Sequence, residues 1–399
     1  MRAALRTRRS RCRWIAALVA GALLAGCSAS SPPSSATSPT STSSTPTTTA
    51  APVRQGFVTA SRLIASDLGI AATLDGATST ARVFVTNDWL HWRDVTPPGM
   101  AAAVDDLFAL DRSRWWVTSS SCRDGSSRET VWRTRDAGRT WASTPAGGHV
   151  CAAGSTSSVR FLTGNFGWLV DIQPTGPVAD LWVTDDGGTT WTRRSSRLPE
   201  LGSVVFRTPT DGFLGGPCPP HWQDCKLYVT HDGGATWADA TTSVDTTAAD
   251  LPSWQVRYAA PTFFDAAAGV MPVTFVKADT ESVAWYSTSD GGRTWAIRAA
   301  PRSPGITEDD PANLEVAVTS AASASVWWEA ARYRANWRTE VTVDAGRTWS
   351  VAESTPIWAG PHRLQAVDGQ HAWLNAGNGA LLATSDGGAV AAGLNPHAP

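Results

Sequence analysis

The chain has 399 residues, of which 42% are hydrophobic, and it carries 33 basic and 35 acidic side chains. Its first 26 residues contain six arginines and no acidic residue, so the remainder carries 27 basic and 35 acidic side chains, a net charge of −8. Nucleic acid is therefore disfavoured as a partner, because phosphate binding requires a basic surface.

The N-terminal segment predicts export. Its arginines precede the apolar run WIAALVAGALLAG (14–26), which is too short to remain as a membrane-spanning helix. The run ends in Leu24-Ala25-Gly26-Cys27, which resembles the lipobox of bacterial lipoproteins. We expect residues 1–26 to be a lipoprotein signal peptide and Cys27 to be lipidated, which would anchor the exported chain to the outer face of the bacterial cytoplasmic membrane. A signal peptide followed by an incidental cysteine is the alternative.

Residues 27–53 are predicted to form a tether. After the cysteine, the segment SASSPPSSATSPTSTSSTPTTTAAPV has no charge and almost no large apolar side chain. Such a composition cannot bury enough surface to offset the entropy of ordering, so we expect a disordered chain. Its root-mean-square reach would be about 28 Å. Residues 54–399 then form the folded domain.

A short motif recurs through residues 54–399. Strong copies are RTRDAGRTW (133–141), VTDDGGTTW (183–191), VTHDGGATW (229–237), STSDGGRTW (287–295) and VTVDAGRTW (341–349), and weaker copies are VTNDWLHW (85–92) and ATSDGGAV (383–390). The aligned aspartates are 48, 50, 46, 58, 54 and 42 residues apart. This period is typical of a four-stranded propeller blade.

A second pattern precedes each motif and completes the unit. Segments such as VRFLTGNFGWLV (159–170) and VVFRTPTDGFLGG (204–216) combine an apolar strand, a polar turn and another strand. Each unit is therefore predicted to contain an inner strand, a second strand, a third strand and an outer strand. The sequence predicts an all-β fold, a seven-bladed β-propeller of four-stranded antiparallel blades. Because the first and last motifs are weak, a six-bladed ring is the alternative.

The five strong copies match the Asp-box, or bacterial neuraminidase repeat, S/T-x-D-x-G-x-T-W. Together with the G-[FW] strands that frame them, they resemble the propellers of the photosystem II assembly and stability factor family. Asp-boxes also occur in sialidases, so the resemblance implies the fold more specifically than the function.

The motif itself is interpreted as structural. A turn aspartate can accept hydrogen bonds from backbone N–H groups, and glycine supplies the positive φ of the turn. The tryptophan should begin the outer strand and pack within or between blades. These assignments cover Asp136, Asp186, Asp232, Asp290, Asp344 and Asp386, with Trp141, Trp191, Trp237, Trp295 and Trp349. No metal site or cofactor is predicted.

The loops at the opposite end of the blades are the predicted binding surface, since variable loops on a rigid scaffold usually carry binding. Export to an oxidising compartment also favours disulfides between the cysteines of these loops. We expect Cys218 to pair with Cys225 and Cys122 with Cys151. Aromatic and charged side chains on the same loops form the candidate binding face: His221, Trp222, Arg332, Tyr333, Arg334 and Trp337.

The sequence shows little evidence of a catalytic site. A sialidase should show a Phe/Tyr-Arg-Ile-Pro segment in its first blade, which begins instead with RQGF (54–57). The adjacent carboxylates Asp105 and Asp106 are interpreted as surface groups that point to opposite faces of a strand. No catalytic residue is therefore assigned. The sequence predicts a scaffold that binds a protein partner or assists assembly, and the alternative is a sialidase-like glycoside hydrolase or a carbohydrate-binding propeller with a glycan partner.

Overall fold

The computed structural model describes residues 57–397, except 101, 124–125, 149–155, 174–177, 217–225, 252, 278–279, 303–313, 321–323, 331–335, 345–346, 355–362, 376–378 and 389–391. All of the described residues belong to one compact unit, Val53–Pro399. The predicted signal peptide, Cys27 and the tether lie outside the described residues, so those expectations stay predictions.

Consecutive strands form antiparallel sheets that succeed one another along the chain. The first sheet contains β1 (Phe57–Ala65), β2 (Leu68–Leu74), β3 (Ala81–Thr86) and β4 (Trp92–Asp94). The second contains β5 (Val104–Ala109), β6 (Trp115–Arg123), β7 (Ser126–Thr134) and β8 (Ala142–Pro145). The third contains β9 (Thr156–Phe161), β10 (Gly167–Gln173), β11 (Val178–Thr184) and β12 (Thr192–Ser195). The fourth contains β13 (Ser203–Phe206), β14 (Gly212–Gly215), β15 (Tyr228–Thr230) and β16 (Ala238–Asp239).

The remaining strands continue the pattern. The fifth sheet contains β17 (Gln255–Tyr258), β18 (Thr262–Phe263), β19 (Gly269–Lys277), β20 (Thr280–Thr288) and β21 (Ala296–Arg302). The sixth contains β22 (Leu314–Val318), β23 (Ala324–Ala330), β24 (Asn336–Thr342) and β25 (Ser350–Ser354). The seventh contains β26 (Arg363–Ala366), β27 (Ala372–Asn375), β28 (Leu381–Thr384) and β29 (Ala392–Leu394).

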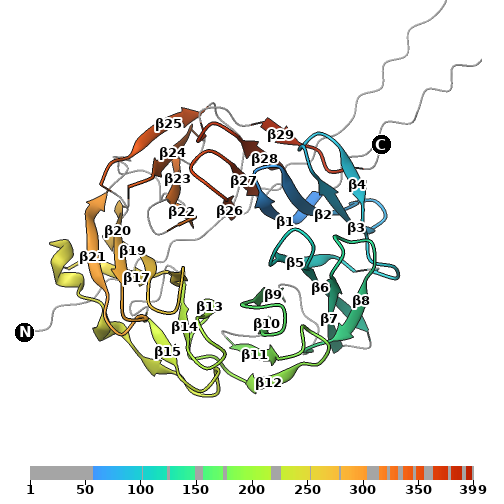
Figure 1. Cartoon of the computed structure of the whole chain (residues 1–399), viewed down its shortest axis with the longest axis horizontal. Helices are drawn as coiled ribbons and strands as arrows, with labels where there is room; N and C mark the ends of the chain where they lie inside the picture. Colours follow the sequence, from blue (N-terminus) through green and yellow to red (C-terminus); the bar gives the residue numbers. More distant parts are fainter. Residues whose placement is uncertain are drawn as a thin grey trace, which may run out of the picture. The chain divides into compact units, whose positions relative to one another are not determined.

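The unit is a β-propeller, as the repeats predicted. The sheets follow one another around a common centre, with the first strand of each sheet innermost (Figure 1). Within the described parts of the chain, six sheets have the predicted four strands and one has five. Neighbouring first strands contact each other at several places in the ring, including β1 with β5, β5 with β9 and β22 with β26.

The fifth sheet departs from the predicted unit because its inner strand is broken. Both β17 and β18 pair with β19, and the residues between them include Pro261. Proline has no N–H to donate, and Pro272 of β19, which lies opposite Ala259, removes a second donor beside the break in the ladder. Two short 3₁₀ helices, η1 (Thr241–Ser243) and η2 (Thr246–Ala249), precede β17. In the described part of the chain, no helix is both long and apolar enough to cross a membrane.

The hydrophobic core lies between adjacent sheets. One cluster joins Phe108 and Trp116 of the second sheet to Phe161 and Leu169 of the third. The rings of Trp116 and Phe161 stack with their centroids 3.7 Å apart and their planes 14° apart. Aromatic side chains fill such interfaces because each buries a large apolar area. The tryptophan-rich composition thus serves packing between sheets.

Contacts between the first and last sheets close the ring. The N–H of Val58 donates to the carbonyl oxygen of Gly379 at 2.9 Å. The side chain of Gln365 donates to the carbonyl oxygen of Ser61 at 2.8 Å and accepts from the N–H of Leu63 at 2.8 Å. All three bonds involve β1, so the inner strand of the first sheet is fixed to β26 and to the residues just before β28.

Candidate functional site at the centre of the ring

The aspartates of the repeated motif form hydrogen bonds within their own turns. The Oδ1 atom of Asp186 accepts from the N–H groups of Thr189 and Thr190, each at 2.9 Å. The hydroxyl of Thr190 donates to its Oδ2 atom at 2.7 Å. Thr184 donates to Oδ1 at 2.8 Å and accepts from the N–H of Gly188 at 2.9 Å. Both carboxylate oxygens are therefore occupied by the turn, which leaves this aspartate little capacity to bind anything else.

The same pattern recurs in the other turns that connect the third and fourth strands, here called the aspartate turns. Equivalent bonds from two threonines surround Asp136, Asp232, Asp290 and Asp344, and Thr384 donates to Asp386. The threonine hydroxyl, followed by the N–H of the same residue, lowers the pKa of Asp136, Asp232 and Asp344 to about 2. These carboxylates are ionised at neutral pH and serve as acceptors for the turn.

The first turn uses different residues, although its aspartate still accepts from backbone N–H groups, those of Leu90 and His91. His91 replaces the second threonine, and its Nδ1 atom lies 2.6 Å from Oδ2 of Asp88. Trp89 replaces the first glycine and adopts a φ of 65°. The atypical sequence of this turn therefore changes its side chains but not the role of its aspartate.

The tryptophans of the motif pack between sheets. Each lies directly before the fourth strand rather than within it, since β8, β12, β16, β21 and β25 begin one residue later. The indole N–H of Trp141 donates to the carbonyl oxygen of Val95 in the preceding sheet at 2.8 Å. The other four belong to clusters that also contain residues of the preceding sheet: Trp191, Trp237, Trp295 and Trp349.

The aspartate turns share one end of the sheets with the turns between the first and second strands, as predicted. The N–H of Gly187 donates to the carbonyl oxygen of Asn165 at 2.8 Å, and that of Gly233 donates to Thr210 at 2.9 Å. Gly291 donates in the same way to Ala267 at 2.8 Å. We call this end of the propeller the aspartate-turn end.

The predicted binding face was assigned to the opposite end, and most of it lies outside the described residues. This applies to His221, Trp222, Arg332, Tyr333, Arg334, Cys218, Cys225 and Cys151. Only the backbone of two further positions is described, Trp337 in β24 and Cys122 near the end of β6. The disulfides and the binding face therefore stay predictions.

Two cavities open where the inner strands lead into the aspartate-turn end. One, of about 520 Å³, is lined by residues of β1, β22 and β26 and by the turn after β5. The other, of about 620 Å³, is lined by residues from β1, β5, β9, β13 and β18 and the segments that follow β9, β13 and β18. Arg62 of β1 lines both, so it lies at their junction.

Arg62 carries a charge that no described acceptor compensates directly. Its side chain is half-buried, and its guanidinium carbon lies 5.3 Å from the centroid of the Phe108 ring. Burial, and secondarily the positive charge of Arg160, lower the pKa of Arg62 to about 10, while the carboxylate of Asp106 acts in the opposite direction. The group remains charged at neutral pH. Among the described residues, none accepts a hydrogen bond from its guanidinium.

Asp106 forms ion pairs with two neighbouring arginines. Its side chain is 5% exposed and accepts hydrogen bonds from Arg160 and from the N–H of Val159, the latter at 3.1 Å. Arg363 of β26 lies 3.5 Å from its other oxygen. The sequence-based interpretation of Asp105 and Asp106 as surface groups was wrong, because Asp106 is buried and Asp105 is half-buried. Their separate contacts do agree with opposite faces, since Asp105 accepts a hydrogen bond from Ser120.

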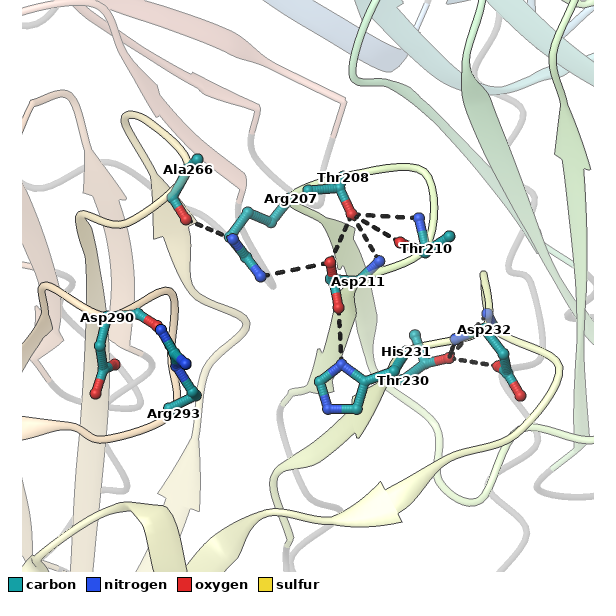
Figure 2. A network of polar contacts seen from close by, with 11 residues as sticks. Arg207, Thr208, Thr210, Asp211, Thr230, His231, Asp232, Ala266, Asp290 and Arg293 are labelled. Atoms are coloured by element: carbon teal, nitrogen blue, oxygen red, sulfur yellow. Dashed lines mark hydrogen bonds and ion pairs between the residues drawn. The ribbon is translucent and has the colours of Figure 1, made fainter.

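Arg207 adds a third guanidinium to the wall of the larger cavity. Figure 2 shows how it is held: it donates to the carbonyl oxygen of Ala266 and lies 3.5 Å from a carboxylate oxygen of Asp211. Its guanidinium carbon is 6.0 Å from the ring centroid of Phe263. Phe264, which is 36% exposed, lines the same cavity and offers apolar surface.

The arrangement combines fixed cations with aromatic surface and is suited to binding anions. Arginine forms paired hydrogen bonds with carboxylates, and half-buried sites strengthen such contacts. The described residues contain no group of three or more His, Cys, Asp or Glu side chains arranged to hold a metal ion. The site residues Arg62, Arg160 and Arg363 were not predicted, because no local motif marks them.

Comparisons with known proteins agree with this fold. No protein-family model matches the sequence, and no curated protein matches it significantly. An uncharacterized protein from Listeria monocytogenes EGD-e superposes with a TM-score of 0.53 at 8% identity, over 87% of this chain and 96% of that one. At such identity the likeness shows the fold alone.

Two further solved structures are more distant. YCF48 bound to a D1 peptide gives a TM-score of 0.41 at 19% identity, covering 73% of this chain and 81% of its own. Aleuria aurantia lectin in complex with Fucα1-6GlcNAc gives 0.42 at 12% identity, covering 76% and 97%.

Proposed function

We propose that the protein is an exported, lipid-anchored β-propeller of seven blades, the five-stranded sheet included, that acts as a protein-binding or assembly scaffold. Its central site holds an acidic segment of a partner at the aspartate-turn end. The observation that carries this proposal is Arg62, a half-buried guanidinium without a described acceptor at the junction of two cavities.

The energetics favour an anion from outside the chain. Burying a charge is costly unless a partner compensates it. Asp106 is already engaged by Arg160 and the N–H of Val159, so it contributes only a longer-range interaction with Arg62. A carboxylate brought by a ligand would supply the missing acceptor and could form two hydrogen bonds with the guanidinium.

The lining favours a polypeptide over a neutral saccharide. The larger cavity is lined mainly by apolar side chains and arginines, among them Phe108, Val205, Pro261 and Phe264. Protein-binding surfaces are rich in aromatic and arginine side chains of this kind. A neutral saccharide would instead need polar groups for its hydroxyls, and few neutral ones line this cavity.

We expect replacement of Arg62 by glutamine to weaken the binding of acidic peptides at least tenfold, a loss of about 1.4 kcal/mol. The measurement is fluorescence polarisation of labelled acidic, neutral and basic peptides with the full chain in detergent. Arg82→Gln is the matched control, because Arg82 is an exposed arginine of β3 paired with Asp94 at 2.6 Å. Equal affinity of Arg62→Gln and the unsubstituted protein would contradict the proposed site, and hydrolysis of a glycoside panel would favour the enzyme alternative.

The proposed anchor predicts a change in location when Cys27 is replaced by alanine. The thiol is the acceptor of the lipid, so the variant should no longer incorporate labelled fatty acid and should leave the detergent phase in a phase-partition experiment. Cys12→Ala, which alters a cysteine within the predicted signal peptide, is the control and should remain lipidated. Unchanged labelling of the Cys27 variant would contradict lipidation at this position.

A further inference from the structure

A third cavity, of about 710 Å³, lies between the fourth and fifth sheets at the aspartate-turn end. Its walls include Arg207, Asp211 and His231 from the fourth sheet and its turns, and Ser289 and Arg293 from the aspartate turn of the fifth. Its volume is within the range of small-molecule sites and far exceeds the space that an inorganic ion needs. It shares Arg207 with the larger central cavity, but Arg62 does not line it.

One wall carries a histidine held in a defined orientation. The Nδ1 atom of His231 lies 2.7 Å from Oδ1 of Asp211. The Oδ2 atom of Asp211 accepts from the hydroxyl of Thr208 at 2.8 Å and lies 3.5 Å from Arg207. A carboxylate at Nδ1 fixes the ring and the tautomer with its proton on Nδ1, which leaves Nε2 as a hydrogen-bond acceptor for a ligand. Nε2 has no hydrogen-bond partner among the described residues.

The facing wall carries an exposed arginine whose terminal nitrogens can reach a ligand. Arg293 uses its Nε–H to donate to the carbonyl oxygen of Asp290 at 3.0 Å, within its own turn. The carboxylate of Asp290 is occupied by the hydroxyls of Thr288 and Thr294 at 2.7 Å each. Within the described ranges, the terminal nitrogens of Arg293 have no acceptor. Figure 2 shows Arg293 and His231 on facing elements that line the cavity, with Arg207 and Asp211 above them in this view.

The remaining carboxylates of the cavity are already paired, so they do not prevent an anion from entering. Asp239 forms an ion pair with Lys226 at 2.8 Å. Asp211 lies 3.5 Å from Arg207 and 2.7 Å from Nδ1 of His231. The walls thus present a guanidinium, an imidazole nitrogen and the hydroxyl of Ser289 to a ligand.

This combination occurs at one sheet boundary among those described. At the position of His231, the other strong copies of the motif have Arg135, Asp185, Ser289 and Val343. None of these side chains can present an oriented imidazole to the next sheet. The site is therefore a local addition to the repeat and is not required by the fold itself.

We propose that this cavity binds an acidic saccharide, a small polyhydroxylated molecule that bears a carboxylate or a sulfate. Its oxyanion would bind the terminal nitrogens of Arg293, and Nε2 of His231 would accept a hydrogen bond from one of its hydroxyls. Arginine recognises both kinds of oxyanion through paired hydrogen bonds. The sugar hydroxyls would contact Ser289 and the polar backbone of the two turns, and the volume accommodates the ring as well as the anion.

The test is isothermal titration calorimetry of the full chain in detergent with glucuronate, glucose 6-sulfate, glucose and inorganic sulfate. We expect at least one acidic sugar to bind at least tenfold more tightly than both glucose and inorganic sulfate. Arg293→Gln and His231→Phe should each weaken that binding tenfold or more. Arg347→Gln, in the corresponding position of the sixth aspartate turn, and Arg62→Gln should leave it unchanged.

The outcomes separate this site from the central one. Failure of both acidic sugars to bind would overturn the proposal, as would equal binding of glucose, which would remove the need for an anion. Binding of inorganic sulfate as tight as that of the sugars would overturn the saccharide assignment. Loss of binding in Arg62→Gln alone would place the saccharide in the central site and contradict the cavity between the sheets.

Discussion

Replacement of Gly292 by alanine is expected to lower the free energy of unfolding by about 2–4 kcal/mol. Gly292 adopts a φ of +86°, and a Cβ atom at this position would lie 2.4 Å from the Cζ atom of Phe213. Phe213 is 2% exposed and belongs to the preceding sheet, so it cannot move without disturbing the core between the two sheets. Alanine would therefore add backbone strain and a steric clash at once.

Two glycines with different surroundings separate these contributions. Gly99 has a φ of +82° and no atom within 4 Å of an added Cβ, so Gly99→Ala should show the strain alone, about 1 kcal/mol. Gly393 has neither a positive φ nor a near neighbour, and Gly393→Ala should change stability by less than about 0.5 kcal/mol. The measurement is the shift in the midpoint of thermal or urea unfolding. A Gly292 variant no less stable than the Gly99 variant would refute the close packing of this turn against the preceding sheet.

The aspartate turns could be predicted because their chemistry is local. The threonine, aspartate and glycine that bond to one another lie within nine residues, and the same spacing recurs along the chain. Thr184, Asp186 and Gly188 form their hydrogen bonds inside one turn, so no distant contact is needed to specify it. The first turn also shows the limit of this reading, because His91 replaces a threonine that the motif requires.

The central site could not be predicted because its residues are distant in the sequence. Arg62 and Arg363 lie in the first and last sheets, and only closure of the ring brings both near Asp106. Each inner strand contributes a different side chain to the central site, so the site residues do not recur at a fixed spacing in the sequence. The broken inner strand of the fifth sheet was missed for a related reason, since the break depends on Pro261 and Pro272 lying near each other on two segments that pair only in the fold.

The described cavities lie at the aspartate-turn end, which the sequence had predicted to have only a structural role. The aspartate turns have a sufficient structural role, which favoured the opposite loops as the binding surface. However, the residue between the threonine and the aspartate differs from one turn of this chain to the next, and His231 occupies that position in the fourth turn. A turn whose aspartate only supports the backbone can therefore still carry a ligand-binding residue at a neighbouring position.

Replacement of Asp105 by asparagine is expected to raise the thermal midpoint by about 3–6 °C at pH 8 and to change it little at pH 4. Burial raises the pKa of Asp105 to about 7; the hydrogen bond from Ser120 opposes this shift, and the charges of Glu129 and Asp106 add to it. Between the unfolded pKa, near 4, and the folded one, the native state binds the extra proton. The contribution of Asp105 to the free energy of unfolding is therefore fully present below pH 4, falls as the pH rises toward 7, and stays low above pH 7.

Asparagine removes that loss because it is neutral at every pH and its carbonyl oxygen can still accept from Ser120. The experiment is a series of thermal unfolding curves from pH 4 to pH 8. Asp265→Asn supplies a control of opposite sign: the N–H groups of Ala268 and Ala267 lower the pKa of Asp265, so its contribution is present above pH 4 and is lost on acidification. If the Asp105 variant differs from the unsubstituted protein by the same amount at pH 4 and pH 8, Asp105 does not titrate in this interval, and its carboxylate must be ionised throughout beside Asp106.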